Sequence, residues 1–298
     1  TEIYTLSLHD ALPISVMGET GGTANFAAAI AVLLMIVAGL VFLVQNFVAT
    51  RREYALNSLN PPERKKATGI GGWLMHGAVY GVVLIATLPL LTVIYTSFRN
   101  TQGVIFVDGY SLDSYRRVFQ TMTRPIINSF TFGFLAIAGI LIVGVLVAYV
   151  TVRKANGATR VLDMFVMFPY VIPGAVLGIT LLLTFSKPPF LLHGTMAIIV
   201  ISYIVRRLPY TVRSSAAILR QMNPSIEEAS VSLGATPGKT FLRVTLPAML
   251  PGVFSGAILS WITVLNELSS TLILYTGRTI TMPVAIFQQV MNAQFGTA

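Results

Sequence analysis

The chain contains no cysteine, which excludes disulfide bonds, thiolate metal sites and a cysteine nucleophile. It has only 3 histidines, and they are scattered without the spacing that metal ligands show. Charged residues are also scarce: they make up 10% of the chain, whereas soluble domains carry about 25%. Hydrophobic residues make up 54%, and the mean hydropathy is +0.75. This composition predicts a membrane protein.

Among the charged residues that are present, basic side chains predominate. The 20 lysines and arginines outnumber the 11 acidic residues, which gives a net charge of +9. In a soluble protein such a charge would suggest nucleic-acid binding. Here the basic residues mostly cluster beside long apolar runs, so membrane topology explains them and we expect no nucleic-acid partner.

The beginning of the chain does not have the pattern of a signal peptide. Residues 1–15 lack a basic start and a continuous apolar core. They resemble translated sequencing-adapter read-through, so we expect an artefact or a disordered segment; a short periplasmic segment is the alternative. The first apolar run, 26–49, can cross a bilayer, which takes about 20 residues. Because Arg51 and Arg52 follow it, residues 50–72 are predicted to form a cytoplasmic linker.

Five further apolar runs follow, which gives six predicted spans in total. Between them we expect an external segment at 99–127 with an amphipathic middle, a cytoplasmic turn at 155–159 and an external turn at 186–194. Helical character is expected to continue from the fifth run to Gln221. The runs are 73–98, 129–152, 162–185, one that starts near 195 and reaches Arg206, Arg207 and Pro209, and 250–265.

Small residues at a spacing of four mark two of these spans for close packing. Gly174 and Gly178 lie in the fourth span, and Gly252 and Gly256 lie in the sixth. This spacing lets the backbones of neighbouring helices approach closely. Prolines in the fourth span predict a kink that neighbouring helices stabilise.

A polar stretch, 223–251, interrupts the apolar chain and is predicted to form two short helices joined at a glycine. Asn223 followed by Pro224, or Ser225 with Glu228 three residues later, supplies a helix start. The first helix then carries an apolar face at helical spacing.

That apolar face consists of Ile226, Ala229 and Leu233. Gly234 is expected to end the first helix, because a left-handed backbone after a helix is least costly without a Cβ.

Thr236 and Pro237 are expected to begin the second helix, since they provide a cap and a first-turn proline. Leu246 followed by Pro247 is expected to end it.

The order Glu228-Ala229-Ser230, then Gly234-Ala235, then Leu246-Pro247 resembles the EAA loop of importer-type ABC permeases, with Ser230 in place of the usual second alanine. In that family the loop is the cytoplasmic coupling helix that sits in a groove on the ATP-hydrolysing subunit. An ordinary amphipathic hairpin between two spans is the alternative. The resemblance assigns ATPase coupling to Glu227, Glu228, Ala229, Ser230, Gly234, Ala235, Pro237, Phe241, Val244, Leu246 and Pro247.

Residues 234–240 also look like a phosphate-binding loop, but they are one residue too short, because Leu233 occupies the position where a glycine is needed. The run before them is helical, whereas such a loop follows a strand. We therefore expect this chain to bind no nucleotide or other cofactor, and ATP hydrolysis to take place in a separate subunit.

Three polar residues near span ends are candidates for a solute pathway: Glu267, Asn266 and Arg206. A carboxylate that faces lipid is costly, so Glu267 should point to water or to a partner, and a position at the membrane interface is the alternative. For Arg206 and Arg207, snorkelling to the interface is the favoured interpretation.

From Trp73 onward the chain resembles one permease domain of the type I importer class. This resemblance implies an all-α membrane protein, a polytopic helical bundle with about six spans present and the final one missing, so that 73–298 would be truncated at its C-terminus. The runs LPYTVRSSAAILRQMNPSIEEASVSLGA and NELSSTLILY look most like the fused two-domain ferric iron permeases. Residues 16–49 would then be the last span of a preceding permease domain.

The resemblance also implies location and partners. It places the chain as a multi-pass protein of the bacterial inner membrane, with cytoplasmic ABC ATPase subunits, a periplasmic or lipid-anchored solute-binding protein and the lipid bilayer as partners. Ferric iron is the expected solute, and phosphonate, thiamine or polyamine are alternatives. An ion-gradient-driven secondary transporter is a further alternative. An intramembrane enzyme is disfavoured, because Asp163 and Glu267 are isolated in the sequence.

Overall fold

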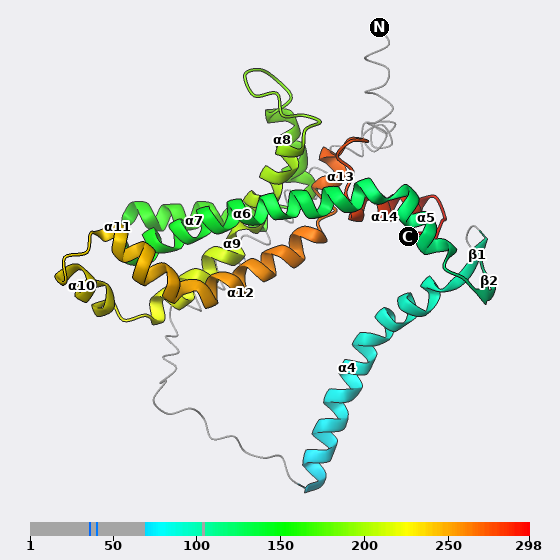
Figure 1. Ribbon diagram of the computed structural model, residues 1–298, viewed down its shortest axis with the longest axis horizontal. Coiled ribbons are helices and arrows are strands. Elements are labelled where there is room, and N and C mark those ends of the chain that lie inside the picture. Colours follow the sequence, from blue (N-terminus) through cyan, green and yellow to red (C-terminus); the bar gives the residue numbers. More distant parts are fainter. Residues whose placement is uncertain (1–35, 37–39, 41–68, 103–104) are drawn as a thin grey trace. The chain divides into compact units, whose positions relative to one another are not determined.

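The computed structural model describes residues 36, 40, 69–102 and 105–298 (Figure 1). The segments predicted at 1–15, 16–49 and 50–72 therefore lie outside the described residues, apart from 36, 40 and 69–72. The chain divides into two compact units. One contains Arg124–Ala285 and is called the bundle unit below, and the other contains Leu40–Thr123 and Ile286–Ala298.

The described part of the chain is mostly helical, and its elements have the following bounds. They are α4 (Gly69–Ser97), β1 (Arg99–Gln102), β2 (Ile105–Tyr110), α5 (Asp113–Thr121), α6 (Thr123–Arg153), α7 (Gly157–Val171), α8 (Gly174–Thr184), α9 (Met196–Gln221), α10 (Ser225–Ser232), α11 (Pro237–Thr240), the π-helical turn η1 (Phe241–Thr245), α12 (Leu246–Leu265), α13 (Thr271–Leu274) and α14 (Met282–Met291).

Within the described residues, three helices are long and apolar enough to cross a membrane, or four if the bent α7–α8 pair counts as one span. The three are Gly71–Ser97, Thr123–Arg153 and Pro237–Leu265. The predicted fifth span, α9, is a continuous helix to Gln221 as expected, but it is not among them. From Arg206 onward it carries four arginines, which lower its hydropathy.

The predicted fourth span is broken rather than kinked. α7 and α8 meet at a bend of 108°. Ile172, between them, has an extended backbone with ψ of 129°. The cause is Pro173, because a proline ring disfavours the helical region for the residue before it.

The sixth span begins earlier than predicted, and the expectation that Leu246-Pro247 ends a helix is wrong. In η1 the backbone N–H of Leu246 donates to the carbonyl of Phe241, five residues back, which widens the helix by one residue. Pro247 follows directly after this widened turn, which accommodates the proline in an otherwise continuous helix. The helix therefore continues through the proline to Leu265.

The segment 99–127 contains a β-hairpin, which the all-helical prediction missed. β1 and β2 pair antiparallel, with Arg99 opposite Tyr110 and Gln102 opposite Ile105. No residue of β2 is buried, so its sequence shows no alternation of apolar and polar residues. The amphipathic middle of the segment is the helix α5, as expected.

α9 and α12 run antiparallel and form the most extensive helix contact in the bundle unit (Figure 1). The predicted glycine packing is confirmed here. A Cβ on Gly256 would lie 2.7 Å from the Cα of Thr211 and 3.1 Å from the carbonyl of Tyr210. One turn earlier, the carbonyl of Gly252 accepts a hydrogen bond of 2.7 Å from Ser214. The two backbones approach so closely because neither glycine has a side chain.

Gly178 has the same role at a second contact. A Cβ there would lie 3.0 Å from the Cβ of Ile273 and 3.1 Å from the carbonyl of Ser270, so α8 packs closely against α13.

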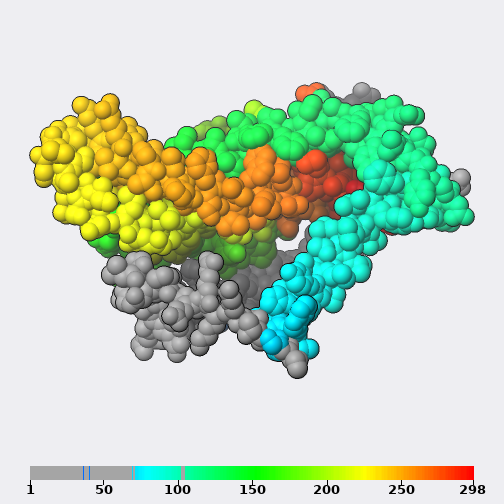
Figure 2. Space-filling view, turned by 60° about the horizontal axis from the view of Figure 1, so that its bottom comes forward, coloured from blue at the N-terminus to red at the C-terminus, as the bar shows by residue number. Residues whose placement is uncertain are grey.

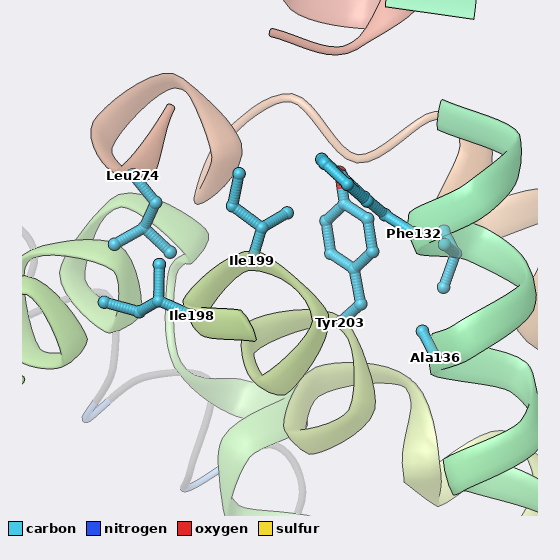
Figure 3. Close-up of a cluster of buried hydrophobic side chains, with 7 residues drawn as sticks. Phe132, Ala136, Ile198, Ile199, Tyr203 and Leu274 are labelled. Carbon is cyan, nitrogen blue, oxygen red and sulfur yellow. The ribbon is translucent and has the colours of Figure 1, made fainter. Parts of the chain in front are cut away.

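One core cluster of the bundle unit joins α6, α9, α12 and α13. Its buried side chains are Phe132, Ala136, Ile198, Ile199, Tyr203, Val264 and Leu274. Figure 3 shows Ile199 and Tyr203 on α9 between Phe132 of α6 and Leu274 of α13. Within this core the hydroxyl of Tyr203 pairs with that of Thr271 at 2.9 Å, which satisfies two polar groups that would otherwise be costly to bury.

We predict that Gly256→Ala destabilises the bundle unit by about 1–3 kcal/mol, because the new methyl group overlaps backbone atoms of α9. Thermal unfolding of the detergent-purified protein would show this as a melting temperature a few degrees lower. Gly81→Ala in α4 is the matched control, since no atom lies within 4 Å of a Cβ at that position. Equal melting temperatures for the two variants would contradict the close approach of α9 and α12.

Candidate functional site

The polar segment that the sequence singled out forms α10, α11 and η1, at one end of the bundle unit (Figure 1). Of the two predicted helix starts, the one at Asn223 and Pro224 is confirmed. The side-chain oxygen of Asn223 accepts from the N–H of Ser225 at 3.1 Å. The capping box between Ser225 and Glu228 does not form, because Ser225 already lies inside α10 and the capping position is Pro224.

Gly234 ends α10 as predicted. Its φ is +89°, in the left-handed region. The N–H of Gly234 donates to the carbonyl of Val231 at 2.9 Å, and the N–H of Ala235 donates to that of Ser230 at 3.2 Å. These two bonds form a Schellman motif, which satisfies the last carbonyls of the helix and turns the chain back.

The second short helix also begins as predicted. Thr236 caps α11, with its hydroxyl accepting from the N–H of Lys239 at 3.4 Å, and Pro237 occupies the first turn. The hydroxyl of Thr240, which is buried, pairs with Ser230 at 3.0 Å and joins α11 to α10.

α10 has no buried residue, although its sequence has an apolar face. Ile226, Val231 and Leu233 are all exposed, and Leu233 is 89% exposed. In Figure 2 this segment is the yellow and gold region at the left-hand end of the bundle unit. The apolar face of α10 therefore takes no part in the packing of the bundle unit.

The far end of the segment is packed into the bundle. The ring of Phe241 meets Tyr149 of α6 edge-on, with centroids 4.8 Å apart. Phe241 and Leu246 border a second core cluster, which consists of Val145, Leu219, Met249 and Val253.

The structure thus separates the predicted coupling residues into groups. Three of them contact the rest of the bundle unit: Glu227, Phe241 and Leu246. Ser230 contacts Thr240 within the segment, and Ala235 and Val244 are half-buried. The exposed ones are Glu228, Ala229, Gly234, Pro237 and Pro247.

Arg153, the last residue of α6, is not among the site residues predicted from the sequence, yet it contacts this segment. Its Nε donates to the carboxylate of Glu227 at 3.0 Å, and its Nη2 donates to the carbonyl of Met222 at 3.2 Å. The only signal for Arg153 in the sequence was its place at the end of a span, which indicates topology rather than a contact.

A buried charge cluster lies at the other end of the α9–α12 pair. Glu267 is only 2% exposed and forms ion pairs with Arg206, at 2.5 Å, and with Arg207. It also accepts from the N–H and the hydroxyl of Ser270, both at 3.3 Å. The carboxylate therefore joins α9 to the turn between α12 and α13.

Two of the three pathway candidates are brought together in this way, and Asn266 is not. Asn266 is exposed and donates to the carbonyl of Ile262 within its own helix, at 2.8 Å. The interpretation of Arg206 and Arg207 as snorkelling side chains is wrong, because both guanidinium groups turn inward to Glu267. Among the described residues, no group of three His, Cys, Asp or Glu side chains could hold a metal ion.

The sequence model of the family described as "Binding-protein-dependent transport system inner membrane component" matches residues 140–298, more than half of the chain. The chain belongs to this family. The match includes α10, α11 and η1, so the membership predicted from the EAA loop is confirmed. The members compared with this permease are transport subunits rather than enzymes, which removes the intramembrane-enzyme alternative.

Three relatives illustrate the family. The permease is 27% identical over 285 residues to the ferric transport system permease protein FbpB of Actinobacillus pleuropneumoniae, covering 91% of this chain and 40% of that protein. It is 28% identical over 212 residues to the putative ferric transport system permease protein FbpB 1 of Haemophilus influenzae, covering 70% and 32%. It is 28% identical over 214 residues to the putative 2-aminoethylphosphonate permease PhnV of Salmonella typhimurium, covering 71% and 81%.

The permease thus spans less than half the length of the two ferric transport relatives. Among solved structures, it resembles a bacterial ABC transporter that imports the acidic polysaccharide alginate, with a TM-score of 0.61 at 15% identity, covering 80% of this chain and 92% of that one. This likeness confirms the predicted fold class, a helical membrane bundle of the ABC importer permease kind.

We predict that Glu267→Gln destabilises the permease strongly. It removes the only carboxylate shown to pair with the two arginines, and breaking a buried ion pair by removing one partner costs about 3–5 kcal/mol. Immunoblots of membrane fractions should show much less protein, and the purified remainder should unfold at a lower temperature. Asn266→Ala, one residue earlier, is the control and should leave both quantities unchanged. If Glu267→Gln accumulated and melted like the control, the buried cluster would not support the fold.

Proposed function

We propose that this permease is the membrane-spanning subunit of an ATP-driven importer in the bacterial inner membrane. On this proposal α10, α11 and η1 dock on a cytoplasmic ATPase subunit, and a periplasmic or lipid-anchored binding protein delivers the solute. The chain itself binds no cofactor and hydrolyses no ATP. Ferric iron is the proposed solute.

The observation that carries the proposal is the shape of α10. Glu227 on α10 faces the bundle and pairs with Arg153. Ile226 and Leu233, although apolar, are exposed. This apolar face is free to be covered by a partner, and exposed apolar patches are where partners bind. The matching family, whose members are binding-protein-dependent inner-membrane components, supports a cytoplasmic ATPase as that partner.

The geometry suggests how motion would pass from the ATPase into the membrane. α10 follows α9 after a short connection, and α11 continues through η1 into α12 without a break. A displacement of α10 would therefore move α9 and α12, two helices that are packed along their length. Such movement of a bundle around a central site is alternating access by rigid-body rocking. In this scheme Glu267 and Arg206 hold the moving helices together rather than contact the solute.

The relatives support two solutes. The two ferric transport permeases support iron, and the match extends over 91% of this chain for one of them. The 2-aminoethylphosphonate permease supports the second candidate, because there the match covers 81% of the relative's own length. Both solutes would reach the permease from a binding protein, so neither requires a metal cage in this chain.

Uptake measurements test the class and the solute together. Cells that express the permease together with the ATPase and the binding protein encoded by neighbouring genes should accumulate radiolabelled ferric iron. This uptake should stop when ATP is depleted and persist when an ionophore collapses the ion gradients. The opposite response would support a secondary transporter. ATP-dependent uptake of 2-aminoethylphosphonate without iron uptake would replace the first solute by the second.

Gly234→Asp is predicted to abolish uptake while the protein stays in the membrane. An aspartate at a φ of +89° is strained, so α10 would change its angle to α11 and its fit to the ATPase. Solute uptake and membrane abundance should be measured on the same cells. Gly157→Asp is the matched control, because Gly157 is also exposed, has no atom within 4 Å of a Cβ and does not have a positive φ. Normal uptake by Gly234→Asp would contradict the coupling role.

A further inference from the structure

The short helix α10 differs from the long helices of the bundle unit in how it is attached. None of its eight residues is buried, so no apolar core fixes its orientation. Two side-chain contacts on its inner side connect it to other elements. Ser230 pairs with Thr240 of α11, and Glu227 pairs with Arg153 of α6. The Ser230–Thr240 contact stays within the coupling segment, which consists of α10, α11 and η1. The Glu227–Arg153 contact is therefore the one that connects α10 to a membrane span, α6.

Arg153 contacts two other segments at the same time. It is the last residue of α6, a span of 31 residues, and its guanidinium uses different nitrogens for different partners. Nε donates to the carboxylate of Glu227 in α10, and Nη2 donates to the carbonyl of Met222, the residue directly after α9. One side chain therefore joins the inner ends of α6 and α9 to the beginning of α10.

The setting makes this contact stronger than an ordinary surface ion pair. The side chains of Arg153 and Glu227 are only 13% and 15% exposed. Solvent screening is therefore weak, whereas exposed pairs contribute little. The planar guanidinium can donate to two acceptors at fixed angles, which a lysine ammonium does less well.

We propose that Arg153 is a positioning residue that couples α10 to α6. Motion of α10 then enters the membrane bundle by a second route, through α6, in addition to the continuous helix that leads into α12. This inference rests on the proposed function, because it assumes that an ATPase moves α10. It adds that the ion pair, which lies outside the EAA pattern, sets how much of that motion becomes transport.

The first test uses the full transporter with its ATPase and binding protein in proteoliposomes. Arg153→Ala should lower uptake per reconstituted permease at least about tenfold, because the loss of the charge-assisted hydrogen bond to Glu227 alone has that effect and the bond to Met222 is lost with it. ATP hydrolysis should continue, because the docking face of α10 is unchanged. Arg153→Lys and Glu227→Gln, which keep part of the contact, should fall between Arg153→Ala and wild type.

A charge swap separates positioning from a purely structural loss. Arg153→Glu and Glu227→Arg should each uncouple transport, and the double variant should regain much of the uptake, because the pair is restored with its ends exchanged. Absence of any rescue, with all three proteins present in the membrane, would overturn the proposal.

Spin labelling measures the position of α10 directly, and the absence of native cysteine in this chain makes it practical. Labels at Ser232→Cys in α10 and Ala158→Cys in α7, both exposed, report the distance between α10 and the helix that follows α6. Arg153→Ala should broaden the distance distribution. An unchanged distribution would show that Arg153 does not position α10.

A second ion pair between an arginine and a carboxylate provides the control. Arg213 and Asp163 also form an ion pair, at 3.4 Å between α9 and α7, but their side chains are 42% and 31% exposed. Arg213→Ala should leave coupling and label distances unchanged. If wild-type protein itself showed no ATP-dependent uptake, the proposed function would fail. If wild type were coupled and Arg153→Ala equally so, only the present inference would fail.

Discussion

The antiparallel contact of α9 with α12 is the constraint on which the rest of the bundle unit depends. Glycines and small hydroxyl side chains bring the two backbones together, since a Cβ at Gly256 would overlap the Cα of Thr211. The hydroxyl of Ser260 lies in the contact between α9 and α12, which is called the seam below. It forms hydrogen bonds with Thr211 at 3.1 Å and with the carbonyl of Arg207 at 3.2 Å. At one end of this contact Glu267 forms ion pairs with both Arg206 and Arg207. Helices in a bilayer gain little from the hydrophobic effect, so close packing and satisfied polar groups have to hold them together.

The coupling segment begins and ends at the opposite end of this seam. α10 leaves from α9, and η1 returns into α12, so both attachments of the segment are helices that already pack against each other. The π-helical turn lets the returning helix absorb Pro247 without ending. The returning part of the segment, α11 and η1, is therefore continuous with α12, and Phe241 packs into the bundle while Leu233 is exposed. This division between an anchored side and an exposed side is what a docking element needs.

Predictions from local chemistry were accurate. Asn223-Pro224, Gly234 and Thr236-Pro237 bound the short helices as expected, because caps and a left-handed glycine act through residues only a few positions away. The long apolar runs became helices for a similarly local reason. The errors lie where local rules compete. Pro247 should end a helix, but a widened turn accommodates it; Pro173 should only kink one, but it breaks it. The hairpin in 99–110 was missed because neither of its faces is buried.

The amino-acid sequence by itself determined that this is a helical membrane protein with a glycine-ended polar segment, since composition and near-neighbour backbone preferences are written along the chain. Only the tertiary structure decided which charges meet. Arg153 pairs with Glu227 across 74 positions, and Arg206 pairs with Glu267 across 61. No local rule connects residues so far apart. Their pairing follows from how the helices pack, because a buried charge is stable only where folding brings an opposite charge to it.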